Sequence, residues 1–237
     1  LGGKNPQVVF ADADLDAAAD AIVFGICFNA GQCCVSGSRL IVQRGVERAL
    51  TDKICALLDK VRIGDPLEPG TQVGSITEAR HLDRVLGYIA QGHEEGARLV
   101  YGGQRIASPT GLYLQPTVFA DVSAHMVIAR EEIFGPVLTI TAFDDFDQAM
   151  ALANDTPFGL AASIWSRDLE TSLQAMRRIK AGRVWVNTTI AGGPELPSGG
   201  FKQSGIGRET GRYGVEEYTE LKSVHVQMGP RTPWVSA

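Results

Sequence analysis

The stretch Phe28-Asn29-Ala30-Gly31-Gln32-Cys33-Cys34-Val35-Ser36-Gly37-Ser38-Arg39 joins an apolar helical run to an apolar strand. A glycine and a glutamine make the turn, and two adjacent cysteines follow it. A thiolate is a strong nucleophile near neutral pH, and at such a turn it can face a cleft where backbone N–H groups stabilise an oxyanion. Free cysteines are more often small buried apolar residues. Taken alone, the stretch leaves both a reactive and a structural Cys34 open.

The segments on either side of this stretch predict alternating helices and strands. Apolar residues from Leu15 to Ile26 recur at i, i+3 and i+4, and Asp14 is suited to cap that helix. The strand 39–43 follows the cysteines directly. Further strands are predicted at 7–10, 98–101, 112–118, 137–143, 160–165 and 183–187, and further helices at 46–61, 78–95, 146–153 and 169–179. This alternation predicts an α/β fold with a mainly parallel sheet flanked by helices.

The C-terminal segment has a different pattern. Residues 218–227 alternate in polarity, with Leu221, Val224 and Val226 on one side. A strand with no partner in its own chain is available to a neighbouring subunit. We therefore expect a C-terminal oligomerisation strand.

Composition excludes several classes of protein. The 237 residues carry a net charge of -5 with 44% hydrophobic residues, and no stretch concentrates Lys and Arg, which argues against a nucleic-acid partner. No apolar run reaches the length of a membrane span, so we expect no membrane partner.

The cysteines indicate the compartment and argue against a metal. Cys27, Cys33, Cys34 and Cys55 form no CxxC pair and have no histidine at ligand spacing, so no metal site is predicted. Neighbouring cysteines make a poor structural disulfide. Reduced thiols are typical of a reducing compartment, and we expect a cytoplasmic protein.

Six motifs, in the same order along the whole chain, resemble those of the aldehyde dehydrogenase superfamily. They are Leu1-Gly2-Gly3-Lys4, Phe28-Asn29-Ala30-Gly31-Gln32-Cys33-Cys34, Glu131-Glu132-Ile133-Phe134-Gly135-Pro136-Val137, Gly159-Leu160-Ala161-Ala162, Val184-Trp185-Val186-Asn187 and Gly199-Gly200-Phe201-Lys202-Gln203-Ser204-Gly205. A single motif can arise by chance, but an ordered set of six does not.

The resemblance implies catalytic roles. Cys34, the second residue after Gln32, occupies the nucleophile's position, and its thiolate would add to an aldehyde carbon. Hydride would pass to NAD(P)+, and water would release the acid from a thioester. The Cys34 N–H would stabilise the oxyanion together with an upstream asparagine that this chain lacks. Glu209 resembles a family glutamate that assists proton transfer in deacylation.

The same resemblance implies a cofactor site for NAD or NADP. Glu132 would bind the nicotinamide ribose, and Phe134 would pack beside the nicotinamide. The Leu1 amide would approach the nicotinamide end, and Arg84 falls near the adenosine ribose. Without the family, Glu132 fits a solvated acid and Phe134 a core ring. Discrimination at the ribose 2′ position lies upstream, so the choice between NAD and NADP stays open.

The substrate pocket implied by the resemblance contains Phe28, Asn187 and Ser198. Asn187 could instead satisfy the local backbone at the end of its strand. The loop 188–195 is small and polar where relatives that use apolar aldehydes place aromatic residues. Glu195 suggests a cationic amino-aldehyde substrate.

The resemblance covers only part of the family's pattern. The general-base glutamate would directly precede Leu1, which is not a methionine, and the dinucleotide-binding domain would lie upstream. We therefore expect residues 1–217 to form a catalytic domain and 218–237 an oligomerisation strand and tail of a homodimer or homotetramer. Alone, this chain is predicted to be weakly active or inactive.

Two other classes of function stay open. A cofactor-independent thiol esterase or acyl transferase would need a general base near Cys34, yet the four histidines are scattered along the chain. A non-catalytic assembly module would need only a stable core and the terminal strand. Selective alkylation of Cys34 argues against an inert module.

Overall fold

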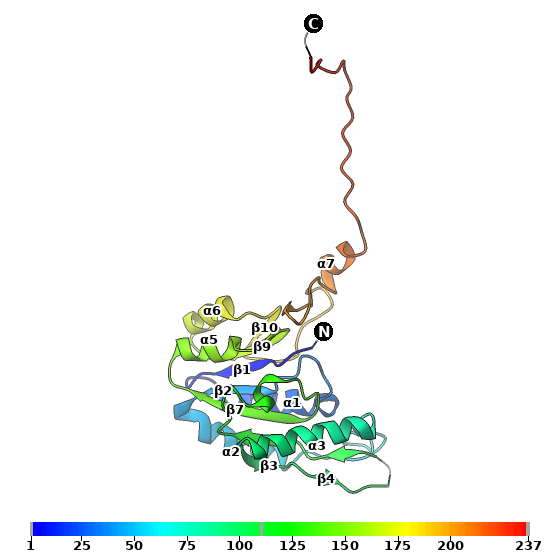
Figure 1. Cartoon of the computed structure of the whole chain (residues 1–237). Helices are drawn as coiled ribbons and strands as arrows, with labels where there is room; N and C mark the ends of the chain where they lie inside the picture. Colours follow the sequence, from blue (N-terminus) through cyan, green and yellow to red (C-terminus); the bar gives the residue numbers. More distant parts are fainter. Residues whose placement is uncertain (1, 110, 236–237) are drawn as a thin grey trace.

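A seven-stranded sheet in the order β10-β9-β1-β2-β7-β6-β3 forms the centre of the computed structural model, which describes residues 2–109 and 111–235 (Figure 1). Six strands run parallel, and β3 at one edge is antiparallel to β6. The predicted fold, a mainly parallel sheet flanked by helices, is confirmed.

The elements follow the sequence pattern closely in the first half of the chain and add short pieces later. The sheet strands are β1 Pro6–Val9, β2 Arg39–Gln43, β3 Arg98–Tyr101, β6 Thr117–Ala120, β7 Val137–Phe143, β9 Ala161–Trp165 and β10 Arg183–Val186. The helices are α1 Leu15–Cys27, α2 Glu47–Leu58, α3 Ala79–Glu94, α4 Val127–Arg130, α5 Phe146–Asn154, α6 Leu169–Arg178 and α7 Gly211–Glu216, with 3-10 turns η1 Phe28–Gly31 and η2 Arg44–Val46. Two small ribbons pair β4 Arg105–Ile106 with β5 Tyr113–Leu114, and β8 Phe158–Gly159 with β11 Phe201–Lys202.

Helices cover both faces of the sheet and make two separate cores. Successive strand residues point to opposite faces, so Val9 and Leu40 pack with α1, α2 and α3, whereas Val8 and Ile41 pack with α5 and α6. All four side chains are almost completely buried. The strands therefore read as continuous apolar runs, as expected for a sheet covered on both faces.

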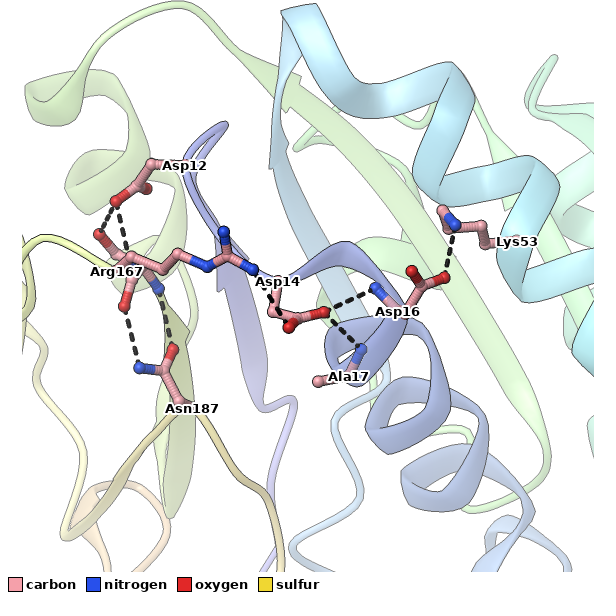
Figure 2. Close-up of polar contacts among 8 residues, drawn as sticks. Asp12, Asp14, Asp16, Ala17, Lys53, Arg167 and Asn187 are labelled. Carbon is pink, nitrogen blue, oxygen red and sulfur yellow. Dashed lines mark hydrogen bonds and ion pairs between the residues drawn. The ribbon is translucent and has the colours of Figure 1, made fainter.

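Polar side chains lie at the C-terminal ends of the parallel strands, which we call the C-terminal edge of the sheet (Figure 2). One carboxylate oxygen of Asp12 accepts hydrogen bonds from Ser166 Oγ and from the N–H groups of Arg167 and Asp168, each at 2.8 Å. The Asn187 side chain closes a second pair of bonds with the Ser166 backbone, at 3.0 and 2.9 Å. Ligands of open α/β sheets usually bind at this edge. Here the hydrogen-bonding groups at the C-terminal edge are paired with one another. The cysteine stretch lies at the opposite edge, where the parallel strands begin, just before β2.

The C-terminal segment, predicted to pair with a neighbouring subunit, has no partner strand among the residues that the structure describes. Residues 218–227 form no strand and run as an exposed, extended segment that leaves the body after α7 (Figure 1). A strand requires a hydrogen-bonded neighbour, and no part of the chain that the structure describes pairs with this segment. The oligomerisation strand therefore stays a prediction, because it requires a second chain.

Asp12 gives a test of the polar edge. Replacing it in Asp12→Ala removes the acceptor of three hydrogen bonds and should lower the free energy of unfolding by about 1.5 kcal/mol, because bonds to a charged group are stronger than neutral ones. Urea unfolding measures the change. The control is Asp20→Ala, which removes an exposed acid from α1 and should change the stability by less than about 0.5 kcal/mol. Equal effects of the two variants would contradict the role of Asp12.

Candidate active site

The chain reverses sharply between α1 and the cysteines. Asn29, Ala30 and Gly31 have φ values of 52°, 54° and 72°, a run of left-handed backbone that side chains resist. The Asn29 amide donates to Gln32 O at 2.9 Å, and the Gln32 amide donates back to Asn29 O at 3.2 Å. At Gly31 a Cβ atom would collide with the Gly135–Pro136 backbone, so only glycine allows this close approach. The predicted helix-to-strand turn is therefore present and tightly built.

The two cysteines lie in a four-residue turn. The Ser36 N–H donates to Cys33 O at 3.0 Å and closes the turn around Cys34. Both cysteines are half-buried free thiols that share a hydrogen bond. That bond and nearby backbone N–H groups lower the pKa of Cys33 to about 6, whereas the neighbouring sulfur and burial raise the pKa of Cys34. The pair thus gives up one proton easily and the second with difficulty.

The other two cysteines have no such environment. Cys27 is buried in the core, and desolvation raises its pKa to about 12. Burial and nearby carboxylates also raise the pKa of Cys55. The two free thiols outside the turn are therefore poor nucleophiles at neutral pH.

Asn5 connects the turn to the sheet. Its side-chain amide donates to Cys34 O at 2.9 Å and to Ser36 O at 2.8 Å, and its oxygen accepts the Ala161 N–H at 3.0 Å. Asn5 precedes β1 and Ala161 begins β9, so the bonds place the cysteines at the edge where these strands begin. Sequence reasoning missed Asn5, although it belongs to the turn 2–6 next to a recognised motif.

Glu132 and Phe134 come to the same edge. Glu132 Oε1 accepts the Gly3 N–H at 3.2 Å, and a Cβ atom at Gly2 would lie 2.6 Å from Oε2, so the glycine at position 2 lets the carboxylate approach the backbone. Burial raises the pKa of this half-buried carboxyl. Phe134 has a φ of 58°, and its carbonyl lies 2.7 Å from His81 Nε2. Cys33, Glu132 and Phe134 line one small cavity, so the predicted nucleophile motif and cofactor motif meet.

Arg84 lies beside this group. A pocket of about 450 Å³ is lined by Arg84, Tyr88, Glu132 and Phe158, among others. Arg84 makes long contacts of 3.4 Å to Tyr88 Oη and to Glu132 O. Three of the four predicted cofactor residues are therefore neighbours, and the fourth, Leu1, lies outside the described residues.

Two buried cations lie where β1 and β2 begin, and their burial was not predicted from the sequence. Arg39 donates to the carbonyls of Lys4, Leu152 and Ala153 at 2.9, 3.1 and 2.9 Å. Lys4 is 1% exposed, and its ammonium has no hydrogen-bond partner among the described residues. Desolvation, together with the neighbouring Arg39, lowers the pKa of Lys4 to about 7, while Glu132 opposes that shift.

The remaining predicted residues lie elsewhere. The backbones of Ser198 and Glu209 pair with each other at 2.6 and 2.7 Å, and both residues line an open groove of about 760 Å³ below the C-terminal segment. Phe28 is half exposed and packs on Phe24. Asn187 lies at the C-terminal end of β10, where its side chain is hydrogen-bonded to the Ser166 backbone. These bonds favour a role in satisfying the local backbone over a place in the substrate pocket.

Neither a metal site nor a membrane helix is found within the described ranges. No group of three or more His, Cys, Asp or Glu side chains there could bind a metal ion. Among the same residues, no helix is both long and apolar enough to cross a membrane.

Comparison with known proteins now identifies the family. The model of the aldehyde dehydrogenase family matches residues 1–224. The chain belongs to the aldehyde dehydrogenase family. It is 46% identical to a betaine aldehyde dehydrogenase of Cereibacter sphaeroides over 97% of this chain and 47% of that protein. The chain thus spans about half the length of the curated relatives it matches.

Solved aldehyde dehydrogenases share this fold. An NAD-dependent aldehyde dehydrogenase from Sinorhizobium meliloti superposes with a TM-score of 0.98 and 56% identity, over all of this chain and 47% of that one. An indole-3-acetaldehyde dehydrogenase in complex with NAD+ has a TM-score of 0.92 and 47% identity, over 94% of this chain and 46% of that one. The predicted family is therefore confirmed.

The pH dependence of alkylation tests the cysteine pair. A pKa lowered to about 6 means that the thiolate of the pair is present above that pH and is lost as the pH falls through it. Iodoacetamide labelling of Cys33 and Cys34 should rise about tenfold from pH 5 to pH 7 and then level off. Cys55, whose pKa is raised, should show a rate that still increases above pH 8. Mass spectrometry of each labelled peptide measures both profiles, and parallel profiles would contradict the assignment.

Proposed function

We propose that the complete protein is an NAD-dependent aldehyde dehydrogenase in which Cys34 is the nucleophile. The observation that carries this proposal is the meeting of the cysteine turn with Glu132 and Phe134 at one small cavity. Family membership and the NAD-dependent relatives support it.

The residues at the sheet edge suit a nicotinamide cofactor. Glu132 accepts the Gly3 N–H with its Oε1 atom, and its second oxygen, Oε2, would accept a ribose hydroxyl. Arg84 lies on the other side of the same pocket, where a cation can approach a ribose or phosphate oxygen. Phe134, 38% exposed, presents a ring against which a flat group can pack. The bound cofactor would supply a hydride acceptor.

The chain's own part in the reaction follows from the thiol pair. The Cys34 sulfur forms a bond to the aldehyde carbon, and the carbonyl π electrons move to oxygen, which the Cys34 N–H stabilises. Loss of hydride from that carbon leaves a thioester, and attack by water releases the acid and restores the thiol. Glu209 would assist the last proton transfer. It lines a separate groove from Cys33 here, so this role depends on contacts made in the complete protein.

The domain boundaries and the activity of the isolated chain are part of the proposal. We assign residues 1–217 to the catalytic domain and 218–237 to the oligomerisation strand and tail. Because the relatives are about twice as long, we expect the general base and the dinucleotide site in the other half, and little activity from this chain alone.

The C-terminal segment supports assembly with a second copy. Leu221, Val224 and Val226 are exposed, and β10 forms an open edge of the sheet. Extended backbone with unpaired N–H groups is the form in which one chain adds to the sheet of another. We propose a homodimer or homotetramer built through residues 218–227. The four free thiols support a reducing compartment such as the cytoplasm.

NADH formation tests the reaction and its nucleophile. The chain extended upstream to its full length should reduce NAD+ with small aldehydes. Cys34→Ala should lower kcat at least about a thousandfold, because the nucleophile is lost. The matched variant Cys33→Ala should retain kcat within about tenfold, because it removes only a hydrogen bond to the pair. Absorbance at the NADH band measures both.

Other outcomes would favour the other classes of function. Ester hydrolysis that depends on Cys34 and ignores NAD+, without aldehyde oxidation, would support a thiol esterase or acyl transferase. An unreactive cysteine pair in an assembled, inactive protein would support the assembly module.

Substrate charge can be tested at Glu195. The name of the Cereibacter sphaeroides relatives points to a cationic aldehyde, whereas that of the NAD+ complex points to an aromatic one. Glu195 is exposed on the loop that continues to Ser198. In the full-length protein, Glu195→Gln should lower kcat/KM for aminoaldehydes about fivefold and leave neutral aldehydes of similar length unchanged, since an exposed charge pair contributes about 1 kcal/mol. Glu68→Gln, at another exposed loop acid, is the control. Equal losses for both substrate classes would reject the cationic substrate.

A further inference from the structure

Asn5 is buried, and its whole side chain is bonded. It is 3% exposed, donates to the carbonyls of Cys34 and Ser36 at 2.9 and 2.8 Å, and accepts the Ala161 N–H. A buried amide with three partners of good length is a rigid connection, because breaking it would leave unpaired polar groups without water.

The bond to Cys34 acts on one particular peptide group. Ser36 N–H to Cys33 O closes the turn, so the Cys34–Val35 peptide lies at its centre. The common turn types differ by a rotation of this central peptide through about 180°. Because the peptide is planar, holding its carbonyl on Asn5 directs the Val35 N–H to the opposite side. The backbone N–H groups of Val35 and Ser36 help to lower the pKa of the Cys33 thiol, which neighbours Cys34 in this turn.

Gly3 leaves room for this contact. A Cβ atom at Gly3 would lie 2.7 Å from Cys34 O and 2.6 Å from Asn5 Oδ1, closer than real atoms pack. The Gly3 N–H meanwhile donates to Glu132. The segment that carries Asn5 therefore contacts the cysteine turn and the predicted cofactor residue within three positions.

We propose that Asn5 is a positioning residue for the nucleophile: its amide fixes the Cys34–Val35 peptide at the centre of the turn that carries the two thiols. The hydrogen bonds of its side chain go to backbone groups, so Asn5 acts through this peptide. Its effect on catalysis rests on the proposed function, but its effect on the thiols does not.

The first experiment measures alkylation of this chain. Asn5→Leu keeps the size of the side chain without its donors, and Asn5→Ala removes the donors and leaves space. Both should label Cys33 and Cys34 about tenfold more slowly at pH 5 and about twofold more slowly at pH 7, because the midpoint of the pH profile moves upward by about one unit when one hydrogen bond to the turn is lost. Labelling of Cys55 should not change.

Gln7, two residues after Asn5 and within β1, offers a matched control. It is also fully buried, and its amide donates to Gly37 O at 3.3 Å, just beyond the turn. Gln7→Leu therefore removes a buried amide bond to the same loop but leaves the Cys34–Val35 peptide held. It should lower the unfolding midpoint while leaving the alkylation profile at its wild-type position.

The second experiment measures catalysis in the full-length protein. Asn5→Leu should lower kcat about tenfold at pH 5 and about twofold at pH 7 with the aldehyde KM unchanged, because the thiolate is affected and the pocket is not. If the wild type forms no NADH, the proposed function fails, while alkylation still decides the role of Asn5. A wild-type alkylation profile in the Asn5 variants, or the same displacement in Gln7→Leu, would overturn the proposal. If neither Asn5 variant folds, Gly3→Ala displaces the same carbonyl, and an unchanged profile there would overturn it.

Discussion

The edge of the sheet that carries the candidate site depends on a buried cation. Arg39 begins β2, is almost fully buried, and donates to three backbone carbonyls from the segment before β1 and from the end of α5. A guanidinium without water must have such acceptors, since an unpaired buried charge is very unfavourable. The positions of β1, β2 and α5 are thereby linked at one point. Lys4 and Asn5, just before β1, and the cysteine turn, just before β2, therefore have little freedom to move relative to each other.

The two ends of the parallel strands differ in the contacts that their neighbouring residues make. At the ends of the parallel strands, Asp12 and Asn187 pair with the backbone after β9 and saturate it with internal hydrogen bonds (Figure 2). At the opposite ends of the strands, glycines at 2, 3 and 31 allow close approach of Glu132, the Cys34 carbonyl and the Gly135–Pro136 backbone, respectively. The usual expectation for an open α/β sheet would place the ligand at the first edge. In this chain internal hydrogen bonds stabilise the C-terminal edge, and the candidate site residues lie where the parallel strands begin.

The sequence predicted the frame of the fold well because its signals are local. The i, i+3, i+4 pattern of α1 and the apolar run of β2 depend on neighbours within a few residues. The short ribbons and α4 were missed, since two to four residues carry no period. The meeting of Cys33 with Glu132, 99 positions apart, could come only from family resemblance. Asn187 illustrates the limit: its residue type suits both a pocket and a strand end, and only the position of Ser166 decides between them.

The electrostatics of the edge explain why a carboxylate and an amine are kept together there. Burial alone favours the neutral form of each group, so it raises the pKa of Glu132 and lowers that of Lys4. Their mutual attraction favours both charged forms, and Arg39 opposes the charge on Lys4. With the pKa of Lys4 near 7, the amine carries a partial charge at neutral pH, and its loss on raising the pH removes support for the Glu132 carboxylate. The Glu132 carboxylate is thus opposed most strongly by its own burial, and it is favoured by the Gly3 N–H and by the charges of Lys4 and Arg84.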